Sequence, residues 1–382
     1  MGFSMVTKLI TIDQAGSERK LRTVAAALVQ GALVGMPTET VYGLAGNALL
    51  PDTVRRIFAV KGRPQDNPLI IHLYDQSQLD QVSELVPPEF YLLYREFCPG
   101  PLTMVMTRSQ ALPSEVSAGL DTVAIRFPAQ RTARNLLRLA GVPVVAPSGN
   151  LSGSPSPTQA QHMLDDLDGK IEYILDDGPC ALGVESTVLD LTASPPQILR
   201  PGVITAELIL ERTGLTVREA PSAVLTKASR AVPPAESQTE DSSQSGSVIF
   251  TPRSPGQKYR HYAPQAPIFI ARGKDRRELI TSLLSRIELE ADRRLGFFGA
   301  EDTFDALQKS LSEMNGLQSA DFVTYLYPGS EQVETATHEL FAALRKLDAA
   351  GVELILTPAF PRQGFGIAYM DRLERAAESE EK

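Results

Sequence analysis

KGRPQDNPLIIHL, residues 61–73, joins a turn that carries two cations to a short apolar segment. Lys61 and Arg63 can both contact an anion, and Gly62 between them allows the backbone to approach a ligand closely. The prolines restrict the conformation of the turn. Considered alone, the turn is compatible with two interpretations, a rigid solvated loop between a helix and a strand or an anion-binding site.

The segments on either side of the turn alternate between helical and strand patterns. Residues 51–62 begin with Pro-Asp and carry apolar residues on one face, which predicts a helix that ends at Gly62. LIIHL is a predicted strand in which Ile70 and His72 face the side opposite to Ile71. Because the alternation continues through the first half of the chain, we expect an α/β domain with a largely buried sheet.

The chain is predicted to contain two domains joined by a linker. The boundaries that we expect are residues 1–215 for the first domain, 216–267 for the linker and 268–382 for a small α/β domain. The second domain has the pattern of a doubly wound parallel sheet, without a GxGxxG or P-loop motif. Within the linker, residues 231–247 are polar and predicted to be disordered, because they cannot offset their ordering entropy by burial. Residues 254–264 differ, since their tyrosines, histidine and cations could stack on a base and contact phosphates.

The composition is that of a globular protein with an acidic net charge. Hydrophobic residues make up 43% and charged residues 22%, and 37 Lys and Arg against 46 Asp and Glu give a net charge of −9. This excess of negative charge argues against a broad nucleic-acid-binding surface, which would need a basic face. Direct binding of tRNA is therefore not expected, whereas a local cationic pocket for a small anion is compatible with the composition.

The two cysteines, Cys98 and Cys180, lie beside prolines in unrelated contexts. Two thiols placed in this way form neither a disulfide framework nor a metal-binding cluster, which fits a reducing compartment. The N-terminal segment lacks the apolar core of a signal peptide, and no apolar run approaches the length of a membrane span. We therefore expect a cytoplasmic protein without membrane attachment.

Side chains with a positive charge or a hydroxyl group recur near the ends of the predicted strands. They are Thr40, Lys61, Arg63, Arg126, Ser148, Ser186 and Arg200. Arg126 lies between apolar residues, so its burial requires a carboxylate partner, either from the protein or from an anionic ligand. The cations, if they meet at one cleft, would suit a polyphosphate, with Mg²⁺ sharing its charge. Since neither a nucleophile motif nor metal-ligand spacing is present, we expect catalysis by positioning and electrostatics.

Taken in order, these motifs resemble one known family. PTETVYGL, KGRPQDNPLIIH, PGPLTMVM, VAIRFP, APSGNLSGSPSPT, VESTVLDL and ILRPG are similar to the motifs of threonylcarbamoyl-AMP synthases, which have a YrdC-like fold. SPGQKYRHYAP followed by a small α/β domain resembles the long, two-domain form of that family. The resemblance implies a catalytic domain with a twisted mixed sheet and a small Rossmann-like C-terminal domain with a parallel sheet.

The resemblance also implies an activity. Enzymes of this family are nucleotidyltransferases that convert L-threonine, bicarbonate and ATP into threonylcarbamoyl-AMP and pyrophosphate. A partner machinery, the tRNA-modifying transferase, then moves the threonylcarbamoyl group to adenosine 37 of tRNAs that read ANN codons. The implied chemistry is formation of a carbamate on the threonine amine, followed by attack of a carbamate oxygen on the α-phosphorus of ATP. His72 or a water molecule would handle the protons, and the sequence does not choose between them.

Individual residues receive roles from the same resemblance. It assigns L-threonine to Thr40, His72, Arg126, the backbone near Ala146, and Ser186, with Arg126 taking the threonine carboxylate. It assigns ATP, together with Mg²⁺, to Lys61, Arg63, Asn67, Thr122, Ser148, Ser156 and Arg200. Lys61 and Arg63 would be catalytic and stabilise the leaving pyrophosphate. Tyr259, His261 and Tyr262 would close over the site as a lid, and the ligands of Mg²⁺ stay unassigned.

Two departures from the family pattern and two alternatives stay open. Gly149 stands where the family usually has alanine, and Asp371 stands where asparagine is expected. The long polar linker could weaken the coupling of the domains.

One alternative function is an RNA-binding module that uses a concave cationic face of the first domain. The other is carbamoyl-adenylate chemistry, as in hydrogenase-maturation proteins, although their zinc-finger and acylphosphatase-like regions are not visible in this sequence.

Overall fold

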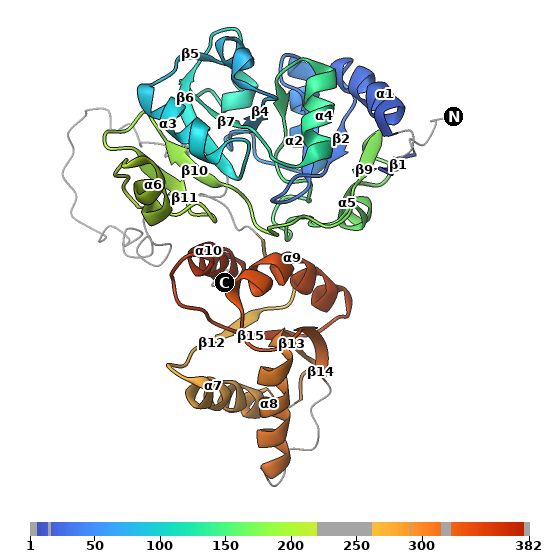
Figure 1. Ribbon diagram of the computed structural model, residues 1–382. Helices are drawn as coiled ribbons and strands as arrows, with labels where there is room; N and C mark the ends of the chain where they lie inside the picture. The colour runs from blue at the N-terminus through green and yellow to red at the C-terminus, as the bar shows by residue number, and fades with distance from the viewer. Residues whose placement is uncertain (1–5, 14–16, 220–261, 291, 315–321, 378–382) are drawn as a thin grey trace, which may run out of the picture.

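The computed structural model describes residues 6–13, 17–219, 262–290, 292–314 and 322–377. These residues form two α/β domains, of which the first is at the top and the second at the bottom of Figure 1. The segment predicted to be disordered, residues 231–247, lies outside the described residues, as do Tyr259 and His261 of the predicted lid.

The first domain is built on one large mixed sheet. Its strands in the described part of the chain are β1 (Lys8–Thr11), β2 (Val34–Met36), β3 (Gly43–Asn47), β4 (Ile70–His72), β5 (Ser83–Leu85), β6 (Leu102–Arg108), β7 (Thr122–Arg126), β8 (Val144–Val145), β9 (Tyr173–Asp176), β10 (Thr187–Asp190) and β11 (Gln197–Arg200). They are arranged in the order β1-β9-β2-β3-β8-β4-β7-β6-β10-β11, and β5 pairs with β6. Because β4 pairs with β7 in parallel and β6 pairs with β7 antiparallel, the predicted mixed sheet is confirmed.

Helices cover this sheet on both sides. They are α1 (Ser17–Val29), α2 (Pro51–Lys61), α3 (Pro88–Phe97), α4 (Arg131–Ala140), α5 (Ala160–Leu167) and α6 (Ala206–Thr213), with two 3₁₀ turns, η1 (Gln76–Gln81) and η2 (Ser114–Ser117). One core cluster packs α2, α3, α5 and α6 against the strands, and another packs α1 and α4 against β2 and β8. The helix α2 ends as predicted, because Gly62 adopts a left-handed conformation (φ 60°) and its N–H caps the last turn.

The second domain contains a smaller sheet with parallel pairing throughout. Its strands are β12 (Ile268–Ala271), β13 (Leu295–Ala300), β14 (Phe322–Tyr327) and β15 (Leu354–Pro358), in the order β12-β15-β13-β14. Its helices are α7 (Arg276–Leu289), α8 (Glu301–Glu313), α9 (Val333–Ala349) and α10 (Phe365–Ala377). Figure 1 shows α7 and α8 on one face of the sheet and α9 and α10 on the other, between this sheet and the first domain. The predicted small parallel α/β domain is confirmed.

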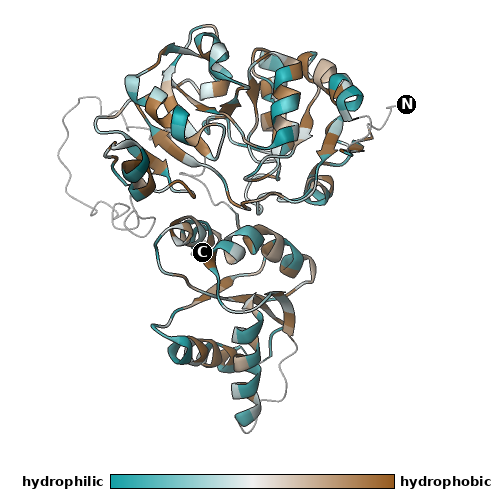
Figure 2. Ribbon diagram, viewed as in Figure 1, coloured by the Kyte–Doolittle hydropathy of each residue, from teal (hydrophilic) through white to brown (hydrophobic). Residues whose placement is uncertain are grey.

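Apolar residues concentrate in the strands and on the inner faces of the helices, as the brown segments of Figure 2 show. Among the described residues, no helix combines the length and the apolar character that crossing a membrane requires. Cys98 and Cys180 are free thiols.

The two domains pack directly against each other. Val41 and Val184 of the first domain belong to the same buried cluster as Phe341 on α9 and Met370 on α10. Arg345, also on α9, donates to the carbonyl oxygen of Pro155 at 2.6 Å and forms an ion pair with Asp166 on α5 at 2.6 Å. Contacts of both kinds, apolar and ionic, therefore hold the second domain against loops and α5 of the first.

Candidate active site

A cavity lies where the ends of β4, β7 and β8 meet the segments that follow β2 and precede β10. Its lining consists of Thr40, Val41, Arg63, Ile70, His72, Arg126, Ala146, Pro147, Ser148, Glu185, Ser186, Arg200 and Tyr262. All five residues assigned to threonine are in this lining, as are Arg63, Ser148 and Arg200 of the nucleotide set and Tyr262 of the lid. Lys61, Asn67, Thr122 and Ser156 lie outside it.

Strand register explains how residues far apart in sequence meet here. His72 on β4 lies opposite Arg126 on β7, and Arg126 in turn lies opposite Thr103 on β6. Along β4, both Ile70 and His72 line the cavity while Ile71 enters the hydrophobic core. The predicted alternation of this strand is therefore confirmed.

Arg126 has a carboxylate partner within the protein. Its Nη2 lies 2.7 Å from Oε1 of Glu39, its Nη1 donates to Oγ1 of Thr40 at 2.8 Å, and its Nε donates to the carbonyl oxygen of Gly100 at 3.4 Å. Each terminal nitrogen of a guanidinium carries two hydrogens, and the second hydrogen of Nη1 and of Nη2 has no acceptor among the described residues. The charge is thus paired, and donors for a ligand carboxylate are left.

Glu39 is a site residue to which the sequence analysis assigned no role. Burial would raise the pKa of its carboxyl group, but the charge of Arg126 and hydrogen bonds outweigh burial, and the pKa lies below its usual value. Its Oε2 accepts hydrogen bonds from the N–H groups of Ala129 at 3.0 Å and Gln130 at 3.3 Å. The sequence contained a signal for this role, because Arg126 requires an acidic partner and an acidic residue stands directly before Thr40.

His72 is buried and electrically neutral at physiological pH. Burial, and secondarily the positive charge of Arg126, lowers the pKa of its imidazole to about 3. Its Nδ1 lies 3.3 Å from the carbonyl oxygen of Ile70. Since a base with so low a pKa takes up a proton poorly near pH 7, we expect His72 to orient a substrate and a water molecule to accept the proton.

The low pKa of His72 predicts a loss of stability in mild acid. The unfolded chain, with an ordinary histidine pKa near 6.5, binds more protons than the folded protein between that pH and about 3. The contribution of His72 to the free energy of unfolding therefore falls as the pH drops through this window, by about 2 kcal/mol between pH 7 and pH 5, and His162, whose pKa burial lowers to about 4, adds a loss of the same sign. Urea unfolding at both pH values should show a loss that is smaller by about 2 kcal/mol in His72→Gln than in the wild type.

His338 provides a control with the opposite sign. Its hydrogen bond to Glu339 raises the pKa of the imidazole, so its contribution to stability is present at low pH and is lost as the pH rises. His338→Gln should therefore lose more stability than the wild type on acidification. Parallel pH profiles for wild type and His72→Gln would contradict the assignment of His72 as a buried neutral group.

Two of the predicted nucleotide-binding cations hold loop backbone in place. The Nζ of Lys61 donates to the carbonyl oxygen of Ser148 at 2.5 Å and also to that of Asn150. Burial and the nearby Arg63 hold the pKa of Lys61 well below its ordinary value. Arg200 donates through Nε and Nη2 to the carbonyl oxygen of Ser186 at 3.2 and 3.0 Å. Lys61 thus lies behind the loop at Ser148, whereas Arg200 itself faces the cavity.

Arg63 faces the cavity and is anchored by the turn that carries it. Its Nε donates to the carbonyl oxygen of Asn67 at 3.2 Å and its Nη2 to that of Pro68 at 2.9 Å. Burial lowers the pKa of its guanidinium to about 10, which leaves it charged at neutral pH. The turn therefore positions Arg63 through its own backbone.

A protein-bound metal cluster is not present among the described residues, where no group of three or more His, Cys, Asp or Glu side chains could hold an ion. Mg²⁺ that accompanies a nucleotide needs few protein ligands, because phosphate and water oxygens fill its coordination shell. The Oδ1 atoms of Asn67 and Asn150 are buried without a hydrogen-bond partner in the described structure. The oxygen of Asn67, beside Arg63, is of the type that Mg²⁺ accepts, so the site fits a nucleotide-borne ion.

Tyr262 lines the cavity and rests on the second domain. Its ring centroid lies 5.2 Å from that of Phe341 and 5.5 Å from Cζ of Arg372, and its backbone has an unusual positive φ of 68°. The cavity measures about 50 Å³, whereas an engineered cavity that accepts benzene measures about 150 Å³. The cavity itself is therefore smaller than threonine and ATP together require.

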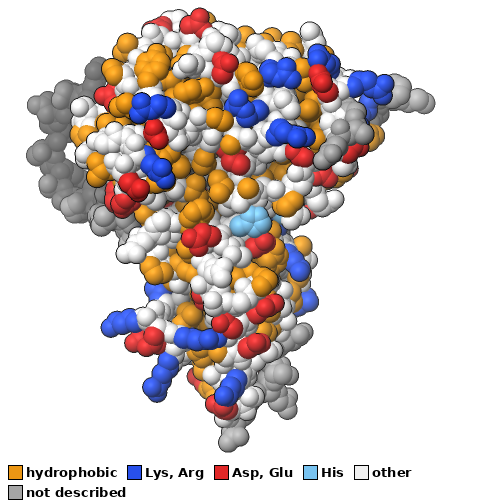
Figure 3. Space-filling model, viewed as in Figure 1, with side chains coloured by type: hydrophobic (Ala, Val, Ile, Leu, Met, Phe, Trp, Pro, Cys, Tyr) orange, Lys and Arg blue, Asp and Glu red, His pale blue; other side chains and the backbone are white. Residues whose placement is uncertain are grey.

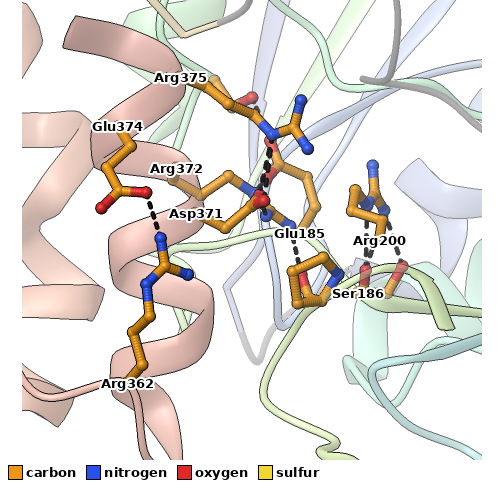
Figure 4. Close-up of polar contacts among 10 residues, drawn as sticks. Glu185, Ser186, Arg200, Arg362, Asp371, Arg372, Glu374 and Arg375 are labelled. Carbon is orange, nitrogen blue, oxygen red and sulfur yellow. Dashed lines mark hydrogen bonds and ion pairs between the residues drawn. The ribbon is translucent and has the colours of Figure 1, made fainter. Parts of the chain in front are cut away.

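The structure brings a second acid, Glu185, into the lining, and this residue was also missed. Its Oε2 lies 2.7 Å from Nε of Arg372 on α10, a contact drawn in Figure 4. The neighbouring Asp371, where the family resemblance led us to expect asparagine, contacts both Arg372 and Arg375. The contacts of Asp371 that the structure shows are therefore ion pairs within α10.

The other departure, Gly149, is compensated by packing. A Cβ atom placed on Gly149 would lie 2.4 Å from Cε and 2.8 Å from Sδ of Met163. Met163 on α5 thus fills the space that an alanine methyl group would occupy, and its flexible end can move. Gly149→Ala should keep the free energy of unfolding within about 1 kcal/mol of wild type. Chemical unfolding and turnover check this, and a large loss of either would show that Met163 cannot yield.

Comparisons with known proteins extend over almost the whole chain. A family model described as "Telomere recombination" matches residues 26–202, and one described as "Threonylcarbamoyl-AMP synthase, C-terminal domain" matches residues 221–378. The threonylcarbamoyl-AMP synthase of Pyrococcus abyssi is 39% identical over 374 residues, covering 97% of this chain and 98% of the relative. That of Bacillus subtilis is 39% identical over 369 residues, covering 96% of each chain. The crystal structure of P. abyssi Sua5 complexed with L-threonine matches with a TM-score of 0.80 at 38% identity, covering 97% of this chain and 98% of that one.

Proposed function

The chain belongs to the threonylcarbamoyl-AMP synthase family, and we propose that it converts L-threonine, bicarbonate and ATP into threonylcarbamoyl-AMP and pyrophosphate. The observation that carries this proposal is the meeting of two kinds of donor in one cavity. Arg126 offers spare N–H groups to a carboxylate, and Arg63 and Arg200 offer positive charge to phosphates. An amino acid and a nucleotide can therefore lie side by side.

Threonine binding is proposed for the side of the cavity at Arg126. The hydroxyl group of Thr38 donates to the carbonyl oxygen of Val41 at 2.7 Å, so in its 2.8 Å contact with Thr40 it acts as the acceptor. Thr40 then donates to Thr38, accepts from Arg126, and keeps a lone pair for the amino group of threonine. Arg126 would take the carboxylate, and neutral His72 and Ser186 would orient the rest of the substrate.

ATP binding is proposed for the side at Arg63, Ser148 and Arg200. Lys61 supports this side by holding the carbonyl groups of Ser148 and Asn150, which fixes the loop that faces the phosphates. Asn67 would contribute an oxygen ligand to Mg²⁺, which would neutralise part of the phosphate charge. As the α-phosphorus–oxygen bond breaks, the guanidinium of Arg63 would stabilise the negative charge that develops on pyrophosphate.

The proposed chemistry needs no covalent enzyme intermediate. The threonine amine and bicarbonate form a carbamate with loss of water, and a carbamate oxygen then attacks the α-phosphorus of ATP. The new bond is that of a mixed anhydride, and pyrophosphate leaves. Because carbamate and anhydride both decompose in water, an enclosed cavity protects them. Closure by Tyr262 and the rest of the predicted lid would serve this purpose.

The product would be used in tRNA modification, where a partner transferase moves the threonylcarbamoyl group to adenosine 37 of ANN-decoding tRNAs. We propose a cytoplasmic location, which the two free thiols support. Direct contact with tRNA is not part of the proposal. Figure 3 shows Lys and Arg side chains interspersed with Asp and Glu on the visible face, without a continuous basic patch among the described residues.

The RNA-binding alternative is not favoured, because its cations are buried. Arg126, Arg200 and Arg63 are only 4%, 6% and 8% exposed, so they are recessed in the cavity and cannot follow a nucleic-acid backbone. Carbamoyl-adenylate chemistry uses a different acceptor from the proposed reaction. Only the proposed reaction depends on threonine, so an assay with and without threonine distinguishes the two.

A direct assay tests the proposal. Purified protein is incubated with ATP, Mg²⁺, ¹⁴C-bicarbonate and threonine, and nucleotides are separated by chromatography under conditions that preserve anhydrides. The expected result is an adenylate that carries label from bicarbonate and, in a parallel sample, from ³H-threonine, in equal amounts with pyrophosphate. A labelled adenylate that forms without threonine would point to the carbamoyl alternative, and the absence of any adenylate would overturn the proposal.

A further inference from the structure

A buried ion pair connects the second domain to the wall of the cavity. Arg372 lies on α10 with a fully buried side chain, and its Nε lies 2.7 Å from Oε2 of Glu185 (Figure 4). Its Nη2 donates to the carbonyl oxygen of Pro201 at 3.0 Å. Glu185 lines the cavity and is only 6% exposed. The second domain thus supplies the counter-ion of a carboxylate that belongs to the site of the first.

Glu185 also contacts the predicted nucleotide side. Its other oxygen, Oε1, accepts a hydrogen bond from the hydroxyl group of Ser156 at 2.5 Å, and Ser156 is fully buried. Burial alone would raise the pKa of Glu185, but the charges of Arg372 and Arg200 outweigh burial and keep it below its usual value. The carboxylate is therefore ionised at neutral pH, and it lines the same cavity as the arginines that would bind phosphates.

Arg372 is oriented by its own domain as well. Its Nη1 donates to Asp371, which accepts a further ion pair from Arg375 at 3.1 Å. Its guanidinium also lies 5.5 Å from the ring centroid of Tyr262. Arg372 thus contacts the carboxylate of Glu185, the ring of Tyr262 and the backbone at Pro201 at once. An ion pair that only held two surfaces together would not require all three contacts.

We propose that Arg372 is a positioning residue for ATP, because it neutralises Glu185 and turns that carboxylate so that its second oxygen holds Ser156. This inference rests on the proposed function and names a role for the second domain within it. Without Arg372, the charge of Glu185 would repel the phosphates and compete for Arg200. The nucleotide site is then complete only when α10 is in contact with the first domain.

A purely structural role makes a different prediction. If the ion pair only fastened the domains, its loss would lower stability and would weaken ATP and threonine binding to the same extent. A positioning role predicts a selective loss of ATP affinity that is restored when the unpaired carboxylate is removed as well. Selectivity and rescue are therefore the informative measurements.

The test compares full-length Arg372→Met, Glu185→Gln and the double variant by calorimetric titration with Mg·ATP and, separately, with threonine. Arg372→Met should weaken ATP binding on the order of tenfold or more, with threonine binding within about threefold of wild type. The double variant should recover most of the ATP affinity, because no uncompensated charge is left. Arg362→Met is the matched control, since Arg362 pairs with Glu374 within the second domain (Figure 4) and should leave both affinities unchanged.

Arg372→Lys keeps the charge and covers the case in which Arg372→Met does not fold. It should retain more ATP affinity than Arg372→Met, because it keeps the charge that neutralises Glu185, but less than the wild type, because an ammonium cannot reproduce the contacts of the guanidinium with Glu185, Asp371 and Pro201. Equal losses of ATP and threonine affinity in Arg372→Met, a double variant no better than the single one, or a lysine variant as weak as the methionine variant would each overturn the inference. Failure of the wild type to form threonylcarbamoyl-AMP would instead overturn the proposed function, while the comparison of ATP affinities would still decide the role of Arg372.

Discussion

Arg126→Lys is expected to weaken threonine binding by roughly 30-fold or more and to leave the dissociation constant of ATP within about threefold of wild type. The guanidinium of Arg126 already donates to Glu39 and Thr40 and keeps further N–H groups for a substrate carboxylate. A lysine ammonium keeps the charge beside Glu39 but cannot reproduce the planar fork that reaches three acceptors at once. Calorimetric titration with each substrate alone measures the two affinities.

Lysine is a better replacement here than alanine. Arg126→Ala would leave Glu39 buried without a counter-ion, which costs about 3–5 kcal/mol and would confuse binding with folding. Arg108→Lys provides a matched control on β6, because Arg108 donates to the carbonyl oxygens of Leu120 at 3.1 Å and Leu112 at 2.9 Å away from the cavity. It should lower stability without changing threonine affinity. An equal loss of ATP and threonine affinity in Arg126→Lys would show that the division of the cavity is wrong.

Gly183→Ala is expected to reduce turnover by roughly 100-fold, as displacements of about 1 Å in an active site can do. Gly183 has a φ of 76°, and an added Cβ would lie only 2.2 Å from the carbonyl oxygen of His338 on α9. Backbone cannot yield as a flexible side chain does, so either α9 or the loop must move. The same loop leads to Glu185, and its Leu182 N–H donates to the carbonyl oxygen of Glu39 at 2.8 Å. Either movement would disturb the contact between Glu185 and the second domain.

Gly178→Ala separates this clash from backbone strain. Gly178 lies in the same loop with a φ of 78°, and an added Cβ would meet no atom within 4 Å. It should therefore show only the cost of a left-handed alanine, about 1–2 kcal/mol in the free energy of unfolding, with unchanged turnover. Steady-state kinetics and chemical unfolding of both variants make the comparison. Equal turnover in the two would mean that close contact with α9 is not needed for activity.

Local patterns in the sequence predicted the framework of the site well. The end of α2 at Gly62 follows from the conformational freedom of glycine, and the two faces of β4 follow from its period of two. The strand β3 was not predicted, because its sequence GLAGN is rich in glycine, which is disfavoured in strands. Packing accounts for Gly46, since a Cβ on it would lie 2.7 Å from Cγ2 of Thr53.

Partners across long sequence distances could not be predicted in the same way. Burial of Arg126 required an acid, but a single sequence does not show whether Glu39, a distant acid or a ligand would provide it. The pair of Glu185 and Arg372 spans 187 positions and two domains. Its geometry depends on how α10 packs against the first domain, which is set by tertiary contacts and leaves no periodic signal in either segment.

Exchange of ³²P between pyrophosphate and ATP tests the central claim most directly, namely that threonine and ATP meet in this cavity and react as carbamate and α-phosphate. Reversal of the reaction returns labelled pyrophosphate to ATP only after the mixed anhydride has formed. We expect exchange when threonine and bicarbonate are both present and none when either is omitted from a degassed solution. Exchange that proceeds without threonine or without bicarbonate would contradict the account.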